Sequence, residues 1–206
     1  MHERPAENIR VEFGDFDAGI LVVQQQNGRT DFVYGAKNDP ALVAPNELAH
    51  IGPVSAAIFA LLNVLSGTED VFAGSLRLAF SPIVVRRGVD NAEVNTLISA
   101  HTRLPLERTD TDILWSVNRP LSARTFAGKI NRVIKWQSIT LQSFSLAAGS
   151  QGFVPAGSTQ MTKFARLELD VNSINDGQPL VPLPSPWETM SEIIDRAMSV
   201  LLGTES

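Results

Sequence analysis

The sequence contains no cysteine among its 206 residues. This absence excludes disulfides, thiolate metal ligands and cysteine nucleophiles, and it fits a reducing compartment. The longest apolar stretch runs from Pro53 to Leu65 and is interrupted by polar residues, so it is too short to span a bilayer. The first residues carry charges and no apolar secretory segment. We therefore expect a cytoplasmic protein that does not bind a membrane.

The common catalytic motifs are also missing. The sequence has no phosphate-binding loop, no three-glycine dinucleotide motif and no Gly-x-Ser-x-Gly elbow. Zinc hydrolysis needs paired histidines at helical spacing, whereas His50 and His101 are isolated and fit surface or core positions better than a general base. Asp15 and Asp17 lie at a predicted turn, where solvated side chains are more common than a metal site. We expect no catalytic residue, no metal and no cofactor. Whether the chain is an enzyme stays open, and the missing motifs favour a chain that is not one.

Composition and length define the kind of chain. With 44% hydrophobic and 19% charged residues, it has the composition of a protein that folds around its own core. The length favours one domain, 1–206, although a subdivision near 1–70 and 71–206 stays open.

Alternating apolar residues predict three strands in the first part of the chain, over 9–13, 19–25 and 31–34. Asn27-Gly28 predicts a two-residue type I′ turn between the last two strands. The apolar stripe from Val54 to Leu65 runs nearly all round a helix, which predicts a central, buried helix.

The second part predicts further strands and two helices. Asp90 and Glu93 form a capping-box pattern at the start of a short helix, and Ser185-Pro186 starts a terminal helix. Three glycines and a proline favour a long turn or a mobile loop over 147–159. The predicted strands cover 75–85, 112–118, 129–146 and 164–171. This order favours the α+β class, with a mostly antiparallel sheet and about three helices including a C-terminal one. Residues 75–118 also fit a strand–helix–strand crossover with parallel strands.

The charged residues divide the chain into three consecutive segments of different net charge. Residues 1–112 carry 15 acids and 9 bases, residues 113–167 carry seven bases and no acid, and residues 168–206 carry seven acids and one base. Aromatic residues between the bases of 113–167 suit an anionic ligand or a nucleic acid. Ion pairing with the acidic flanks explains the same pattern and is the interpretation that we favour. Trp115 and Trp136 fit core positions better than a stacking platform.

Three motifs resemble a sporadically distributed family of uncharacterised bacterial proteins. They are Asn118-Arg119-Pro120, Ile130-Asn131-Arg132 with Lys135-Trp136, and Leu169-Asp170-Val171-Asn172, and the resemblance covers much of the C-terminal half. It implies no activity. It does indicate candidate binding residues, which are Asn118, Arg119, Asn131, Arg132, Lys135, Asp170 and Asn172.

Alternation assigns faces to these residues. Arg132 shares a face with Trp136, whereas Asn131 and Lys135 lie on the opposite face. Arg166, Glu168 and Asp170 form a polar stripe along one strand face. The candidates fit either one converging site or a structural knot in which an arginine pairs with Asp170.

The sequence leaves three functional hypotheses. The first is a non-enzymatic protein-interaction domain, in a homo-oligomer or a small complex with a protein partner. The second is a module that binds an anionic ligand or nucleic acid through the basic segment 113–167. The third is an enzyme of unknown class, built on Arg119, Arg132 and the Glu168/Asp170 stripe.

Overall fold

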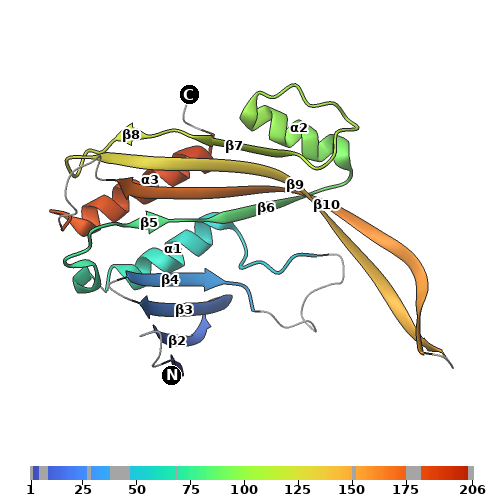
Figure 1. Cartoon of the computed structure of the whole chain (residues 1–206), viewed down its shortest axis with the longest axis horizontal. Helices are drawn as coiled ribbons and strands as arrows, with labels where there is room; N and C mark the ends of the chain where they lie inside the picture. Colours follow the sequence, from blue (N-terminus) through green and yellow to red (C-terminus); the bar gives the residue numbers. More distant parts are fainter. Residues whose placement is uncertain are drawn as a thin grey trace. The chain divides into compact units, whose positions relative to one another are not determined.

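The computed structural model describes residues 2–4, 9–26, 29–37, 47–67, 69–149, 152–174 and 182–203. The chain separates into two compact units, 1–68 and 69–206. This division corresponds to the subdivision that the sequence left open. The class is α+β with three helices and a mostly antiparallel sheet, as predicted (Figure 1). In the described part of the chain, each helix is too short or too polar to cross a membrane.

The first unit contains an antiparallel sheet of four strands that follow one another in space as in sequence. The predicted strand at 9–13 is part of β2, and the strand at 19–25 is part of β3. The predicted turn at Asn27-Gly28 lies outside the described residues. The elements of this unit are β1 (His2–Arg4), β2 (Ile9–Phe16), β3 (Gly19–Gln26), β4 (Arg29–Gly35) and α1 (Val54–Leu65).

Gly19 begins β3 at a close approach of three chain segments. A side chain at this buried position would collide with the carbonyl oxygen of Gly35 and with Ile51 and Tyr34. Gly14, in the neighbouring strand, has open space where a side chain would be. The β2–β3 hairpin therefore requires glycine at Gly19 and not at Gly14.

Helix α1 is less buried than its composition predicts. Only Ala57, Ile58 and Leu65 are buried, and Phe59 is 67% exposed. The prediction of a central, buried helix was therefore wrong. An apolar stripe shows which residues a helix is able to bury, but not how many neighbours cover it.

The second unit is built on a six-stranded sheet with the order β5-β10-β9-β7, in which β6 also pairs with β10 and β8 with β9. Every strand pair in it is antiparallel. Its elements are η1 (Glu69–Phe72), β5 (Ala79–Phe80), β6 (Ile83–Gly88), α2 (Asn91–Thr102), β7 (Leu114–Asn118), β8 (Leu121–Ser122), β9 (Lys129–Gly149), β10 (Gly152–Ile174) and α3 (Pro186–Leu201).

The predicted parallel crossover is wrong. Strands β6 and β7 are separated by β10 and β9, and the successive antiparallel pairings make them run in opposite directions. The helix between them was predicted correctly. Asp90 caps α2 by accepting a hydrogen bond from the amide of Glu93, whose carboxylate accepts one from the amide of Val89.

The core of the second unit lies against one face of β9 and β10. Helices α2 and α3 both contact β10, and α2 also contacts β9 and β6. The ring of Trp136 stacks on His101 of α2 with their centroids 4.9 Å apart, and Trp136 is only 8% exposed. Trp136 is therefore a core residue, as predicted. Residues at alternate positions form this buried face: Ile130, Arg132, Ile134, Trp136, Ala165, Leu167, Leu169, Val171 and Ser173.

Strands β9 and β10 continue beyond the sheet as a two-stranded arm (Figure 1). The pairing of β10 with β6 ends at Lys163, and the pairing of β9 with β7 ends at Gln137. From Leu141 and Thr162 outward, as far as Gly149 and Gly152, the two strands pair with each other and with no other strand among the described residues. The predicted loop over 147–159 is therefore wrong, because most of these residues belong to the paired strands.

Candidate functional site

Strand pairing brings five of the seven predicted site residues onto one face of the second sheet. Asn131 lies opposite Asn172, and Val133 lies between Asp170 on one side and Asn118 on the other. Directly opposed residues of antiparallel strands share a face, and alternate residues of one strand do too. Lys135 follows on the same face. We call this set, namely Asn118, Asn131, Lys135, Asp170 and Asn172, the polar face.

The two charged residues of the polar face, Lys135 and Asp170, each have a partner on the same side of the sheet. Arg166 Nη1 lies 2.8 Å from Glu168 Oε2, and Lys135 Nζ lies 3.7 Å from the same oxygen. Asp170 Oδ1 accepts hydrogen bonds from Asn172 Nδ2 at 3.0 Å and from Ser81 Oγ at 3.4 Å. The predicted polar stripe of Arg166, Glu168 and Asp170 is therefore present, and its contacts form two separate groups, one around Glu168 and one around Asp170.

Asn131 and Asn172 differ from these residues. Their side-chain oxygens are both buried, and neither accepts a hydrogen bond. The two residues are direct cross-strand partners. A buried acceptor without a donor costs about 1–3 kcal/mol. This pair is the part of the polar face whose hydrogen-bonding capacity is not fully used.

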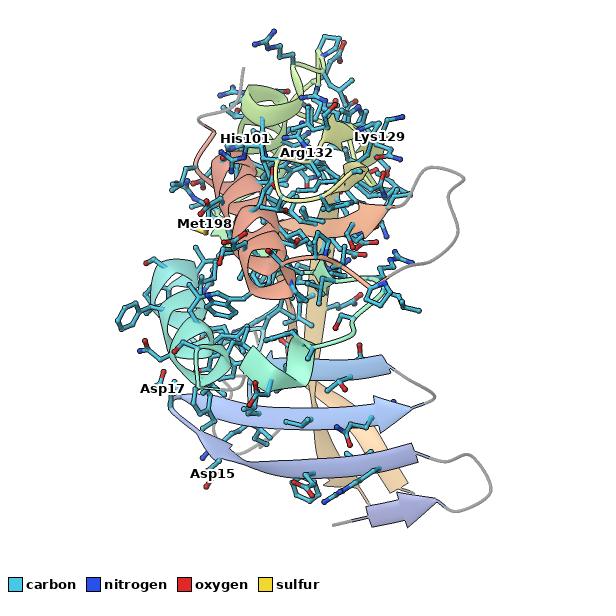
Figure 2. All side chains as sticks on the ribbon, turned by 90° about the vertical axis from the view of Figure 1, so that its left-hand side faces the viewer. Asp15, Asp17, His101, Lys129, Arg132 and Met198 are labelled. Carbon is cyan, nitrogen blue, oxygen red and sulfur yellow. The ribbon has the colours of Figure 1, made fainter. Side chains whose placement is uncertain are left out.

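Arg132 lies on the opposite face, in the core (Figure 2). It is 5% exposed, and its Nε donates to the carbonyl oxygen of Arg119 at 3.1 Å. Burial, followed by the nearby charges of Arg196 and Arg119, lowers the pKa of Arg132. Because Arg132 is paired with Val171 in the sheet, it cannot share a face with Asp170. The structure therefore excludes Arg132 as the arginine that pairs with Asp170, either in a structural knot or in an enzyme pocket. For Arg119 both alternatives stay predictions.

Sequence reasoning missed Glu192, which is buried in the second unit and accepts several hydrogen bonds. It projects from α3, and its carboxylate accepts hydrogen bonds from the backbone amides of Arg124 and Thr125 at 3.0 and 3.2 Å. Thr125 Oγ1 also donates to it at 3.1 Å. Burial alone would raise the pKa of Glu192, but the hydrogen bonds from Arg124 and Thr125 outweigh burial and lower it. The cluster fixes α3 on the segment between β8 and β9.

The bases of 113–167 are largely engaged within the unit. Lys135 and Arg166 meet Glu168, and Arg124 meets Glu192 at 3.1 Å. These two acids belong to the acidic segment 168–206. Lys163 donates to Thr140 Oγ1 at 2.7 Å. The pairing of the bases with an acidic flank, which the sequence favoured, is thus seen for three of them.

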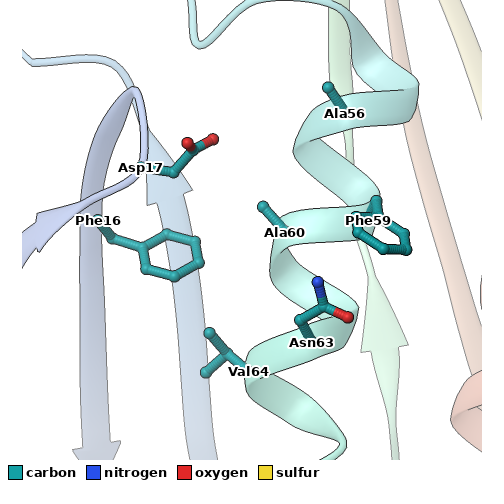
Figure 3. Close-up of a pocket in the computed structure, with 7 residues that line it drawn as sticks. All are labelled: Phe16, Asp17, Ala56, Phe59, Ala60, Asn63 and Val64. Carbon is teal, nitrogen blue, oxygen red and sulfur yellow. The ribbon is translucent and has the colours of Figure 1, made fainter.

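The first unit carries a pocket of about 520 Å³ between the end of β2 and helix α1. Figure 3 shows Phe16 and Asp17 facing the helix, with Ala60 and Val64 pointing toward Phe16. Its acid, Asp17, accepts a hydrogen bond from the hydroxyl of Tyr34 at 3.1 Å. Apart from Asn63 and this carboxylate, the lining of the pocket is apolar, so it offers few groups that could take part in a reaction.

The β9–β10 arm has an unusual composition. Residues 136–162, which include the whole arm, contain no Asp, Glu, Lys, Arg or His. The free part of β9, Leu141–Gly149, is about 26 Å long at the usual rise per residue. A hairpin of only two strands is marginally stable in water. A long uncharged ribbon without a third strand is therefore a structural element that lacks a partner within the described unit.

Comparison of the chain with family models, with curated proteins and with solved structures gave no match.

Proposed function

We propose that this chain is a non-enzymatic protein-interaction module that acts in an oligomer or a small complex. The observation that carries the proposal is the β9–β10 arm, in which the described residues 141–149 and 152–162 show no strand partner other than each other. Unpaired strand edges are a known means of binding another protein by adding strands. Natural edges are commonly protected by charges, and residues 136–162 contain none.

Binding of an anionic ligand or a nucleic acid through 113–167 has less support. Phosphate binding needs bases that are not already paired, and Lys135 and Arg166 are both paired with Glu168. An enzyme has less support again, because Arg132 and Asp170 lie on opposite faces of the sheet.

An arm-shortened variant tests the proposal. Thr140 and Lys163 are direct cross-strand partners, so they can be joined by Asn-Gly, a dipeptide that favours a tight hairpin turn. The variant keeps β5 to β8, α2 and α3, and far-UV circular dichroism with thermal unfolding verifies its fold. Its molar mass, by light scattering, and the proteins it retains from its source cell are then compared with those of the native chain.

The native chain is expected to form a complex, with itself or with another protein, that the arm-shortened variant loses. A native chain that is monomeric at high concentration and retains no protein would overturn the proposal. So would a complex that the folded, arm-shortened variant forms equally well. A fluorescent duplex added at low salt serves as a second readout, because nucleic-acid binding weakens steeply as salt rises.

A further inference from the structure

We infer that the arm pairs with the arm of a second copy of this chain, through the outer edge of β9. The inference rests on the proposed function and names its partner and its contact. The arm offers two edges, and they differ in a way that selects one of them.

The outer edge of β10 is poorly suited to accept a strand. It contains Pro155, which has no backbone N–H to donate. Its pairing with β9 also shifts register between Ala156 and Gln160, which marks a bulge or irregularity. Prolines and bulges are two of the devices by which natural sheets keep an edge from pairing.

The outer edge of β9 has no proline and no bulge over its paired residues. Leu141–Gly149 contains no proline and no charge, and its pairing with β10 includes Leu141–Ser143 and Ser145–Gly149. β9 is therefore the edge at which regular backbone hydrogen bonding can continue to a third strand.

The outer edge of β9 in a second copy of the chain can pair with this edge. Two identical strands pair antiparallel about a two-fold axis, which is the symmetry of most homodimers. The free stretch Leu141–Gly149 overlaps fully with its copy when the axis passes at Ser145. The product is a four-stranded antiparallel sheet with the order β10-β9-β9-β10, which exceeds the size at which an isolated ribbon is only marginally stable.

Charge and sequence pattern favour this occupant. The chain has a net charge of −5, so two copies repel each other in general, but the arms carry no charge with which to repel. Along β9, Phe144, Leu146 and Ala148 alternate with serine and alanine. Their backbone partners include Pro155 opposite Leu146 and Phe153 opposite Ala148. Pairing through β9 thus brings the apolar positions of the two copies next to each other in one sheet.

Cysteine scanning tests the contact directly, because the chain contains no cysteine of its own. Ser145→Cys is expected to give a disulfide-linked dimer under mild oxidation. A mixture of Ser143→Cys and Ala147→Cys is expected to give a linked heterodimer, because these positions face each other across the proposed axis. Ala156→Cys is the matched control: it lies directly opposite Ser145 in the hairpin but in β10, and it should remain unlinked.

Charge at the same positions gives a second measurement that needs no oxidation. Ser145→Lys brings two like charges together at the axis and is expected to weaken the dimer at least about tenfold, since edge lysines oppose strand pairing. Ala156→Lys adds the same charge in β10 and should leave the dimer intact. Sedimentation equilibrium measures both, and circular dichroism controls for the fold.

The outcomes separate this inference from the proposed function. Linkage through Ala156→Cys instead of the β9 positions, or a dimer equally weakened by both lysines, would overturn the choice of β9. A monomeric chain that retains a different protein through its arm would refute self-pairing while the proposed function stands. A monomeric chain that retains nothing would refute both.

Discussion

The carboxylate of Glu192 lies 3.0 Å from the backbone amide nitrogen of Arg124, so a residue of α3 caps the chain between β8 and β9. The Glu192 side chain is 2% exposed, whereas the Arg124 side chain is 64% exposed. The two residues therefore contribute unequally to the stability of the fold, although they form one ion pair. The buried acceptor serves several donors, and the exposed guanidinium is mostly solvated.

This asymmetry predicts different results from removing each partner. Glu192→Gln removes the negative charge and leaves one side-chain oxygen to accept from the amides of Arg124 and Thr125, with an amide NH2 group beside the remaining donors. We expect a loss of about 2 kcal/mol in the free energy of unfolding, within the range of about 1.5–3 kcal/mol for hydrogen bonds to charged groups. Arg124→Ala keeps the backbone amide and should cost less than about 1 kcal/mol, as exposed ion pairs do. Urea unfolding of both variants measures this, and equal losses would contradict it.

The same carboxylate predicts acid sensitivity. Its pKa is lowered in the folded state, so the unfolded chain takes up a proton at a higher pH than the folded chain does. The stabilisation is therefore complete above the ordinary glutamate value of about 4.3 and is lost as pH falls through the folded pKa. Denaturant midpoints measured at decreasing pH should fall more steeply for the native chain than for Glu192→Gln. Parallel curves would show that Glu192 contributes nothing to the acid response.

Local patterns predicted those features that depend on neighbouring residues. The capping box at Asp90 and Glu93 was predicted because its two partners are three residues apart. The opposite faces of Asn131 and Arg132 follow from the two-residue period of a strand, and Arg132 is indeed buried while Asn131 lies on the polar face.

Two features that depend on distant residues were not predicted, the β structure of 147–159 and the role of Glu192. Residues 147–159 have the composition of a loop, yet pairing with a strand of the same hairpin makes most of them β structure. Strand formation depends on such partners more than on intrinsic preference. In the sequence, Glu192 resembles a surface acid on an amphipathic helix, because the residues near it give no indication that it binds the amides of Arg124 and Thr125.

Replacing Gly19 and Gly14 of the β2–β3 hairpin by alanine should affect stability very differently. Gly19→Ala forces a side chain against the carbonyl oxygen of Gly35, a backbone atom that cannot move aside cheaply. We expect a destabilisation of about 1–3 kcal/mol, as for overpacked interiors. Gly14→Ala meets open space and should change stability by less than about 1 kcal/mol. Thermal unfolding of the two variants decides the matter, and a Gly19→Ala variant as stable as Gly14→Ala would show that the strands separate without cost.

Tyr34 offers a spectroscopic test in the first unit, because it is the only tyrosine of the chain. Burial, followed by the hydrogen bond and the charge of Asp17, raises its pKa. The tyrosinate absorbance of the native protein should therefore titrate above the ordinary value of about 10. Since the unfolded chain loses this proton first as pH rises, the stability linked to Tyr34 is complete below about 10 and declines above it.

Asp17→Asn separates the two causes of this shift. Asp17 has a φ of 46°, in the left-handed region that asparagine also tolerates, so the turn should survive. The variant keeps an oxygen acceptor for the Tyr34 hydroxyl but removes the negative charge. We expect the titration midpoint to fall toward the ordinary value while staying above it, because burial remains. A midpoint unchanged from that of the native protein would mean that the charge of Asp17 has no effect on Tyr34.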